Sequence, residues 1–159
     1  MSKLDDSLAD DPLKEIRRAA TGLLARREHS ETEIYRKLQK KGFAEENIQQ
    51  VISVLTQEKL LSNTRFIENY VYFRRGKGLG PLRIQAELME RGIPKELIDH
   101  HMKITDNAWF AEVRDVWRKR FKNRMPADFK TRAQQMRFLY SRGFTSEQIE
   151  SVFKQGFQE

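Results

Sequence analysis

The feature that most constrains how this chain folds is a pattern around glycine that occurs three times. In each copy a leucine lies four residues before the glycine, and an apolar residue follows the glycine directly. Two further apolar residues then recur at helical spacing. The glycines are Gly42, Gly92 and Gly143, which places the copies 50 and 51 residues apart. Repeats of this length predict an array of helical units that bury their faces partly against each other.

The residues that flank these glycines predict helices. Ser30 with Glu33, and Thr145 with Gln148, match the capping box, in which two side chains satisfy free backbone donors at a helix N-terminus. Each glycine is expected to end a helix in the left-handed conformation. No alternating apolar pattern of strand length occurs in the sequence. We therefore expect an all-α fold of three tandem three-helix repeats, each about 50 residues long.

Caps and composition predict where each part begins. The expected parts are a flexible acidic tail at 1–10 and three-helix repeats at 11–61, 62–104 and 105–159. Asp11 suits an N-cap and Pro12 suits the first turn of a helix. Ser62 or Asn63 is expected to cap the first helix of the second repeat.

Helical spacing also predicts which side chains face the core. In the second repeat we expect Phe66, Tyr70 and Phe73 to point inward. In the third repeat the inward set is Phe129, Ala133, Met136 and Leu139. A further aromatic set has two readings, core packing or stacking on nucleic-acid bases, and its match to aromatic positions in the second repeat favours the core. This set is Trp109, Phe110, Trp117 and Phe121.

Composition excludes several classes of protein. The chain has no cysteine, so it has neither disulfides nor thiolate chemistry, which suits a reducing cytoplasm. No apolar run approaches the roughly 18 residues of a membrane span. The N-terminus is polar and acidic and does not resemble a signal peptide. We expect a cytoplasmic monomer without membrane contact.

The sequence contains no recognisable constellation for catalysis or metal binding. His100 and His101 are adjacent, so on a helix they point about 100° apart, and no third ligand has suitable spacing. His29 precedes a capping serine, and we interpret it as a turn residue. Carboxylates lie on predicted wet faces beside lysine or arginine. We expect no catalytic residue, no metal and no cofactor, and hence a protein that is not an enzyme.

A glycine-rich loop runs from Gly76 to Pro81. It lacks the ending of a P-loop, and a helix precedes it where a nucleotide site needs a strand, so it is better interpreted as a turn between helices. One binding role remains open, because the next helix N-terminus has backbone donors that favour an anion. A phosphate or a partner's acidic side chain could bind there, among the basic residues Arg74, Arg75, Lys77 and Arg83.

The charge of the chain is concentrated in one segment. The whole chain has a net charge of +7 and a pI near 9.7. Residues 107–142 contain ten lysines and arginines against three acids, so this segment alone carries +7. Solvated helices usually mix their charges, so the clustering favours a surface for a polyanion, either nucleic acid or an acidic protein. The candidate residues here are Arg114, Arg118, Lys119, Lys122, Arg124, Lys130 and Arg132.

Several ordered segments, taken together, resemble the RecX family, bacterial modulators of the RecA recombinase. They cover roughly residues 15 to 155 and are Leu23–Glu33, Leu60–Phe66, Gly78–Ile84, Glu87–Leu88, Arg91–Ile93 and Arg137–Phe144. One position departs from the pattern, because Ser62 and Asn63 stand where the family often has paired aspartates. Both residues can still cap a helix, so the departure concerns an acidic contact at this point and leaves the fold unchanged.

The resemblance implies a non-enzymatic inhibitor of RecA built as an elongated, curved array of three-helix repeats. Members of the family are thought to lie in the groove of the RecA–DNA filament, where they suppress ATP hydrolysis, coprotease activity and strand exchange. The expected partners are therefore the RecA filament and DNA, single- or double-stranded, with weak sequence preference. The expected processes are homologous recombination, DNA repair and the SOS response.

Two other interpretations stay open. One is a helical module that binds DNA directly, which the charge and the three-helix units permit. No helix rich in Asn, Gln and Arg at base-reading spacing is evident, so sequence-specific binding is not expected. The other is an adaptor array in which the basic charge has no binding role.

Overall fold

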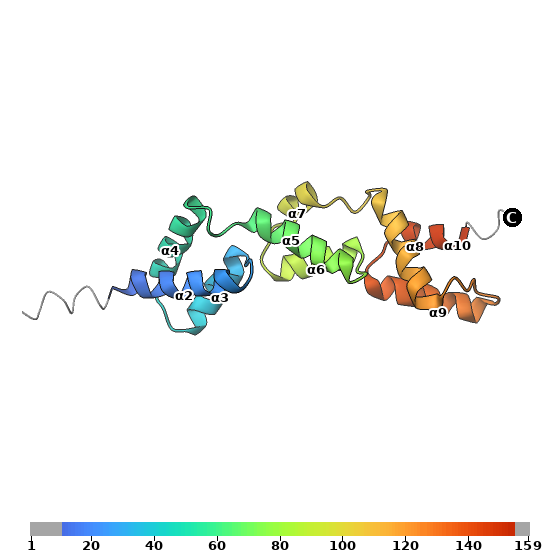
Figure 1. The fold of residues 1–159 in the computed structure, drawn as a ribbon, viewed down its shortest axis with the longest axis horizontal. Coiled ribbons are helices and arrows are strands. Elements are labelled where there is room, and N and C mark those ends of the chain that lie inside the picture. The colour runs from blue at the N-terminus through green and yellow to red at the C-terminus, as the bar shows by residue number, and fades with distance from the viewer. Residues whose placement is uncertain (1–10, 155–159) are drawn as a thin grey trace, which may run out of the picture. The chain divides into compact units, whose positions relative to one another are not determined.

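The computed structural model describes residues 11–154, and every regular element in that range is a helix. The predicted tail at 1–10 and the last residues, 155–159, lie outside this range. Figure 1 shows the described helices, which confirm the predicted all-α class. They are α2 (Pro12–Arg26), α3 (Glu31–Lys40), α4 (Glu45–Gln57), α5 (Asn63–Gly76), α6 (Pro81–Glu90), α7 (Lys95–His101), α8 (Ala108–Phe121), α9 (Phe129–Arg142) and α10 (Ser146–Lys154).

These helices form three consecutive three-helix repeats, α2–α4, α5–α7 and α8–α10, as predicted. By contact the chain divides into two compact units. The first unit contains residues up to Asn69 together with the turn at 91–93, and the second contains 70–90 and the residues from 94 onward. The residue at which each repeat begins stays a prediction.

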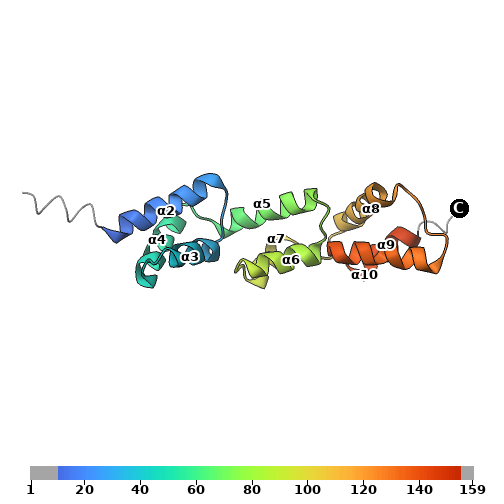
Figure 2. The ribbon, with the colours of Figure 1, turned by 90° about the horizontal axis from the view of Figure 1, so that it is seen from below.

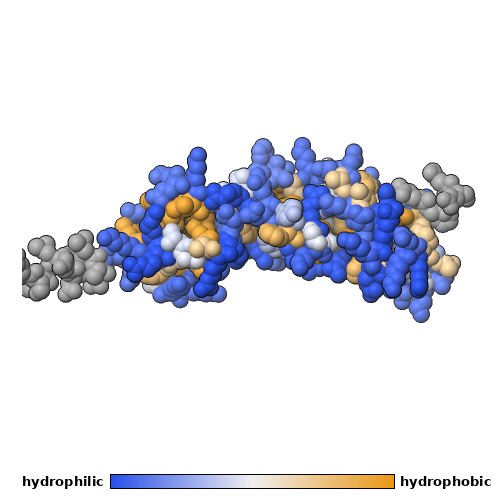
Figure 3. Space-filling model, viewed as in Figure 1, coloured by the Kyte–Doolittle hydropathy of each residue, from blue (hydrophilic) through white to orange (hydrophobic). Residues whose placement is uncertain are grey.

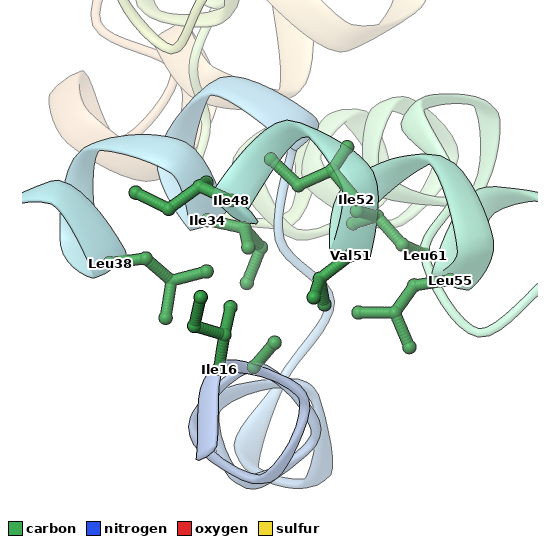
Figure 4. Packing of buried hydrophobic residues seen from close by; sticks show 9 residues of the cluster. Ile16, Ile34, Leu38, Ile48, Val51, Ile52, Leu55 and Leu61 are labelled. Carbon is green, nitrogen blue, oxygen red and sulfur yellow. The ribbon is translucent and has the colours of Figure 1, made fainter. Parts of the chain in front are cut away.

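The first unit is held together by aliphatic side chains from three helices. Figure 4 shows Ile34 and Leu38 of α3 and Ile48 and Val51 of α4 gathered around Ile16 of α2. All five are at most 5 % exposed. Burying side chains of this size contributes about 1.5–3 kcal/mol each, so the apolar spacing of the three helices drives their packing.

The caps predicted from the sequence are present. Asp11 Oδ1 accepts a hydrogen bond from the Leu13 amide at 3.0 Å. Ser30 and Glu33 form the complete capping box at the start of α3. Gly42 ends the following turn with φ +89°, the left-handed conformation that favours glycine. These contacts satisfy backbone groups that a helix end otherwise leaves free.

Ser62 is the cap of α5, because its Oγ accepts from the Arg65 amide at 3.2 Å. Asn63 has a different role. Its side-chain oxygen accepts from the Glu31 amide at 2.9 Å, so it caps the start of α3 across the first unit. The departure from paired aspartates therefore keeps two acceptors at these positions, and both are used within the fold.

The second unit has an aromatic core. Trp109 and Trp117 of α8 are 0 % and 5 % exposed, and Phe153 of α10 is buried as well. The Trp109 indole N–H donates to the Lys103 carbonyl at 3.0 Å. In Figures 1 and 2 helices α8, α9 and α10 lie beside one another. Core packing is therefore confirmed for both tryptophans.

Two residues predicted to face inward are exposed instead, Phe73 by 66 % and Phe129 by 87 %. On α5 the buried residues, Phe66 and Ile67, lie in the first half of the helix, and its last turn carries Arg74 and Arg75 in ion pairs. On α9 the buried residues are Gln135 and Leu139. With 3.6 residues per turn, Phe129 points roughly 80° away from Leu139 and 120° away from Gln135.

His29 was interpreted as a turn residue, but its side chain is almost fully buried, 1 % exposed. Its Nδ1 lies 3.0 Å from the Arg27 carbonyl, and its Nε2 lies 2.8 Å from the Lys37 ammonium. The neutral ring with Nδ1–H as donor fits both contacts. Burial, together with the charges of Arg27 and Lys37, lowers the pKa of His29 below its ordinary value.

Within the first unit the turn at 91–93 docks on the start of α3. The Ser30 hydroxyl donates to the Arg91 carbonyl at 2.7 Å. A Cβ at Gly92 would collide with the Thr32 side chain. The turn at 91–93 thus lies so close to the start of α3 that a side chain at position 92 would not fit.

The second unit repeats this joint one repeat further along the chain. The Gly80 amide donates to the Arg142 carbonyl at 2.7 Å, and the Leu82 amide donates to the Gly143 carbonyl at 2.9 Å. A Cβ added at Gly80 would lie 2.6 Å from the Gly143 carbonyl oxygen. The two joints have the same form. In each, a carbonyl just after the second helix of one repeat accepts a hydrogen bond from a donor at the start of the second helix of the repeat before it.

Gly80→Ala should lower the free energy of unfolding by about 1–3 kcal/mol, because the added methyl overlaps the Gly143 backbone. Urea unfolding followed by circular dichroism measures the change. Gly22→Ala in α2 is the matched control, since its Cβ meets nothing within 4 Å. The control should gain about 0.5–1 kcal/mol from helix propensity. Equal stability of the two variants would contradict the close approach at the joint.

His29 should make stability depend on pH below neutrality. Its pKa is lower in the folded protein than the ordinary value near 6.5, so the unfolded chain binds more protons as pH falls through that value, and stability falls with it. His29→Gln keeps a donor and an acceptor but removes the titration. Its unfolding free energy should fall less than that of the wild type between pH 7.5 and 5.5. Parallel profiles for the two proteins would exclude this origin.

Candidate functional site on the third repeat

The basic residues singled out in the sequence fall into two groups in the structure. Arg74, Arg75 and Arg83 are neutralised by acids of the second unit. Arg74 donates to Glu87 through Nε at 2.9 Å and Nη2 at 2.8 Å, and Arg83 Nε lies 3.5 Å from the same carboxylate. Arg75 is paired with Glu112, and its guanidinium lies 4.2 Å from the Trp109 ring centroid. These arginines hold helices together.

Glu87 is the centre of this ion-pair network. Burial alone would raise its pKa, but hydrogen bonds from Arg74 and the Tyr70 hydroxyl outweigh burial and lower the pKa. The same pairing raises the pKa of Arg74. The carboxylate therefore stays ionised and satisfied, and the group serves structure.

An anion site at the start of α6 stays a prediction, but two of the backbone donors expected for it are occupied. Its amide donors at Gly80 and Leu82 are not free, because they bind the Arg142 and Gly143 carbonyls. The glycine-rich loop is thus part of the joint described above. Lys77 is exposed, and within residues 11–154 its ammonium forms no ion pair.

The third repeat presents cations of a different kind. Arg118 is 3.9 Å from Asp115, the upper end of the ion-pair range. Lys154 is 3.7 Å from Glu150, and the remaining cations of this repeat have no acidic partner among the described residues. We define the basic surface as Arg114, Arg118, Lys119, Lys122, Arg124 and Lys130, of which only Arg114 is partly buried. Arg132 differs from them, because its guanidinium lies 5.3 Å from the Phe153 ring centroid.

Arginines that lie over phenylalanine rings accompany the basic surface, and they are not among the candidate residues predicted from the sequence. The Arg120 guanidinium lies 5.5 Å from the Phe121 centroid and 5.3 Å from the Phe138 centroid. Arg142 lies 5.0 Å from Phe138 on the same ring system. Phe121 and Phe138 themselves meet edge to face at 5.5 Å. Arg120 and Phe121 are neighbours in the sequence. Phe138 lies 17 residues after Phe121, so its contact with these two residues cannot be predicted from local spacing.

The α8–α9 loop has an unusual backbone. Lys122 and Asn123 both adopt the left-handed conformation, with φ 53° and 61°. Two consecutive residues of this kind are strained unless their surroundings hold them. Gln135 supplies that support: its Oε1 accepts from the Trp117 indole at 2.8 Å, and its Nε2 donates to the Arg124 carbonyl at 3.0 Å. A buried amide therefore ties the loop to the core.

A cavity of about 440 Å³ opens at this loop. Its lining contains no acid and is Arg120, Phe121, Lys122, Arg124, Met125, Ala127, Thr131 and Gln135. Apolar side chains therefore stand between cations. On the face drawn in Figure 3, hydrophilic side chains cover much of α8 and α9, with small apolar areas between them. This arrangement can hold an anion that also has an apolar part.

Other kinds of site find no support in the described range. Among residues 11–154 no group of three His, Cys, Asp or Glu side chains is placed to hold a metal ion. In the same range no helix has the length and apolarity needed to cross a bilayer.

Comparison with known proteins gives a consistent result along the chain. Family models for the first, second and third three-helix domains of RecX match residues 17–55, 62–102 and 110–153. Regulatory protein RecX of Pseudomonas putida KT2440 is 41 % identical over 143 residues, covering 90 % of this chain and 91 % of that protein. Regulatory protein RecX of Pseudomonas fluorescens SBW25 is 42 % identical over 139 residues, covering 87 % and 90 %.

Solved structures agree in fold. The crystal structure of RecX from Lactobacillus salivarius superposes with a TM-score of 0.78 at 19 % identity, covering 91 % of this chain and 96 % of that one. A second crystal structure, of a regulatory protein RecX, gives 0.77 at 19 % identity and covers 97 % and 78 %. At this identity the likeness concerns the fold alone.

Gln135→Leu should lower the free energy of unfolding by about 1–3 kcal/mol, because it leaves the buried Trp117 N–H without an acceptor. Chemical unfolding followed by tryptophan fluorescence measures the change. Gln134→Leu is the control, since Gln134 is exposed next to it and its change should stay within about 0.5 kcal/mol. Similar values for the two variants would contradict the support that Gln135 gives the loop.

Proposed function

This chain belongs to the RecX family, and we propose that it is a non-enzymatic regulator of the RecA recombinase. In this proposal it binds the RecA–DNA filament and inhibits ATP hydrolysis, coprotease activity and strand exchange, and so restrains homologous recombination and the SOS response. The family supports the choice of partner. The observation that carries the proposal is the basic surface of the third repeat, where every cation except Arg118 is without an acidic partner among the described residues.

Unpaired cations suit a polyanionic partner for a physical reason. A surface ion pair already formed inside the protein must be broken before its cation can bind elsewhere, whereas an unpaired cation gives up only water and counterions. Acidic protein surface and DNA phosphates both satisfy this condition. We propose that the third repeat binds one or both along the filament, while the second repeat's Arg74, Arg75 and Arg83 serve the fold.

Several contacts along a repeating filament would combine. When one contact forms, the next becomes intramolecular, so weak contacts add to a high overall affinity. Salt should weaken this binding, because exposed charges are screened beyond about 8–10 Å at physiological ionic strength. The proposal is for a protein that acts as a monomer in the bacterial cytoplasm, without cofactor or catalytic residue.

A second candidate is direct DNA binding without RecA and with weak sequence preference. The absence of acids from the cavity lining at the α8–α9 loop favours it, because phosphates would meet no like charge there. Gel-shift titration in a salt series without RecA separates the two. Tight binding without RecA, whether or not it depends on sequence, would favour the DNA-binding module over the regulator.

Titration into a RecA assay should reduce DNA-dependent ATP hydrolysis at or near stoichiometric amounts. Reversing Arg118, Lys119 and Lys122 to glutamate should weaken inhibition at least about tenfold, because attraction becomes repulsion at three points. The matched control reverses Lys14, Arg18 and Arg26 of α2, which are also exposed. The control should inhibit like the wild type.

Two outcomes would contradict the proposal. Absence of inhibition by the wild-type protein would exclude the RecA partner. Unchanged inhibition by the third-repeat reversal, or an equal loss in the α2 control, would mean that the basic surface is not where the filament binds. Circular dichroism of both variants checks that each remains folded.

A further inference from the structure

The third repeat departs from the other two at the start of its second helix. Helices α3 and α6 begin eleven residues before their closing glycines, Gly42 and Gly92, whereas α9 begins fourteen residues before Gly143. The residue of α9 that aligns with the joint residues Ser30 and Gly80 is therefore Thr131. It already lies inside the helix, and its amide donates to Asp128 Oδ1 at 2.7 Å.

The extra turn carries Phe129 and Lys130 into solvent. Phe129 has 87 % of its surface exposed, the largest fraction among the exposed large apolar residues of the described chain. Where the first two repeats receive a glycine turn from elsewhere in the protein, the third presents an aromatic ring beside a cation. Phe129 lies two residues before Thr131, which aligns with the docking residues of the other two repeats, and its ring is left in solvent beside the exposed Lys130.

The surroundings of Phe129 match one chemical class of ligand. Ala127 and Thr131, two residues to either side of Phe129, both line the cavity at the α8–α9 loop, so the start of α9 borders the cavity. We call Phe129 and Lys130, together with Lys122 and Arg124, the rim. Lys122 and Arg124 line the cavity itself, and Lys130 follows Phe129 in α9. Arg120 lies over Phe121 and Phe138, so its planar guanidinium is held against aromatic rings.

We propose that this rim is a binding site for single-stranded nucleic acid. Phe129 stacks on an unpaired base, while Lys122, Arg124 and Lys130 hold the neighbouring phosphates. Flat aromatic and guanidinium surfaces among cations are the combination that single strands use. Duplex DNA keeps its base faces stacked inside and offers Phe129 only its edges. An acidic peptide satisfies the cations, but its carboxylates have no flat face for the ring.

The proposal deepens the DNA-binding part of the function proposed above and does not rest on RecA, so its test uses the full-length protein without RecA. Fluorescence anisotropy of a labelled oligo-dT strand should show about 5- to 150-fold weaker binding by Phe129→Ala, the loss expected for one stacked base. Binding to a duplex of equal length should change less than about twofold. Phe129→Trp should bind oligo-dT at least as well as the wild type, with its emission quenched when the strand binds.

Charge and packing have separate readouts. Lys130→Gln should reduce the salt dependence of oligo-dT binding by about 0.7 in log–log slope, one phosphate contact, while Phe129→Ala leaves the slope unchanged. Tyr72→Ala is the control, because Tyr72 is 74 % exposed on α5 and lies outside this rim. It should bind oligo-dT like the wild type.

Any of the following results would overturn the proposal. Phe129→Ala could leave the affinity for oligo-dT unchanged, or it could lower the affinity for single strand and duplex equally. Tyr72→Ala could lower the affinity for oligo-dT as much as Phe129→Ala does. A Phe129→Ala loss on an Asp/Glu-rich peptide containing one phenylalanine, without a loss on oligo-dT, would also overturn it and assign the rim to a protein. Because RecA is absent, failure here leaves the ATPase result standing.

Discussion

The rest of the structure depends on hydrogen bonds between the end of one helix and the start of another. A helix ends with carbonyls and begins with amides that have no partner inside it. In the second unit the carbonyls of Arg142 and Gly143 bind the amides of Gly80 and Leu82. In the first unit the Arg91 carbonyl binds the Ser30 hydroxyl. Groups that a helix end would otherwise leave unsatisfied thus satisfy each other within each unit.

The basic residues near this joint differ from those of the third repeat in whether an acid pairs with them. Gly80 begins the segment that holds Arg83, and Arg83 and Arg74 both reach Glu87, so these cations stabilise the fold. Within the third repeat, residues 107–142 hold ten lysines and arginines against three acids, and most of these cations are exposed. The cations behind the net charge of +7 therefore have two roles. In the second repeat arginines form ion pairs that stabilise the fold, and in the third repeat most lysines and arginines face solvent.

Much of the fold could be predicted from local rules. The glycines, the capping boxes and the helical spacing depend on near neighbours, and the helices α3, α6 and α10 begin where their caps or proline place them. What the sequence could not provide was contact between distant residues. Asn63 capping α3, His29 against Lys37 and Arg75 on Glu112 each need the folded chain. For the same reason the list of candidate cations mixed paired with unpaired arginines, and Phe129 was assigned to the core.

The turn at Gly42 belongs to the same pattern as the turns at Gly92 and Gly143, yet a Cβ there would meet nothing within 4 Å. The start of α9, at the opposite end of the series, has lost the aligned donor to its extra turn. Another backbone could therefore approach Gly42 without collision, whereas the Thr131 amide is already bonded at the start of its own helix and offers no donor to a glycine turn. The extra turn of α9 thus removes from the third repeat the donor that the first two repeats use in their joints.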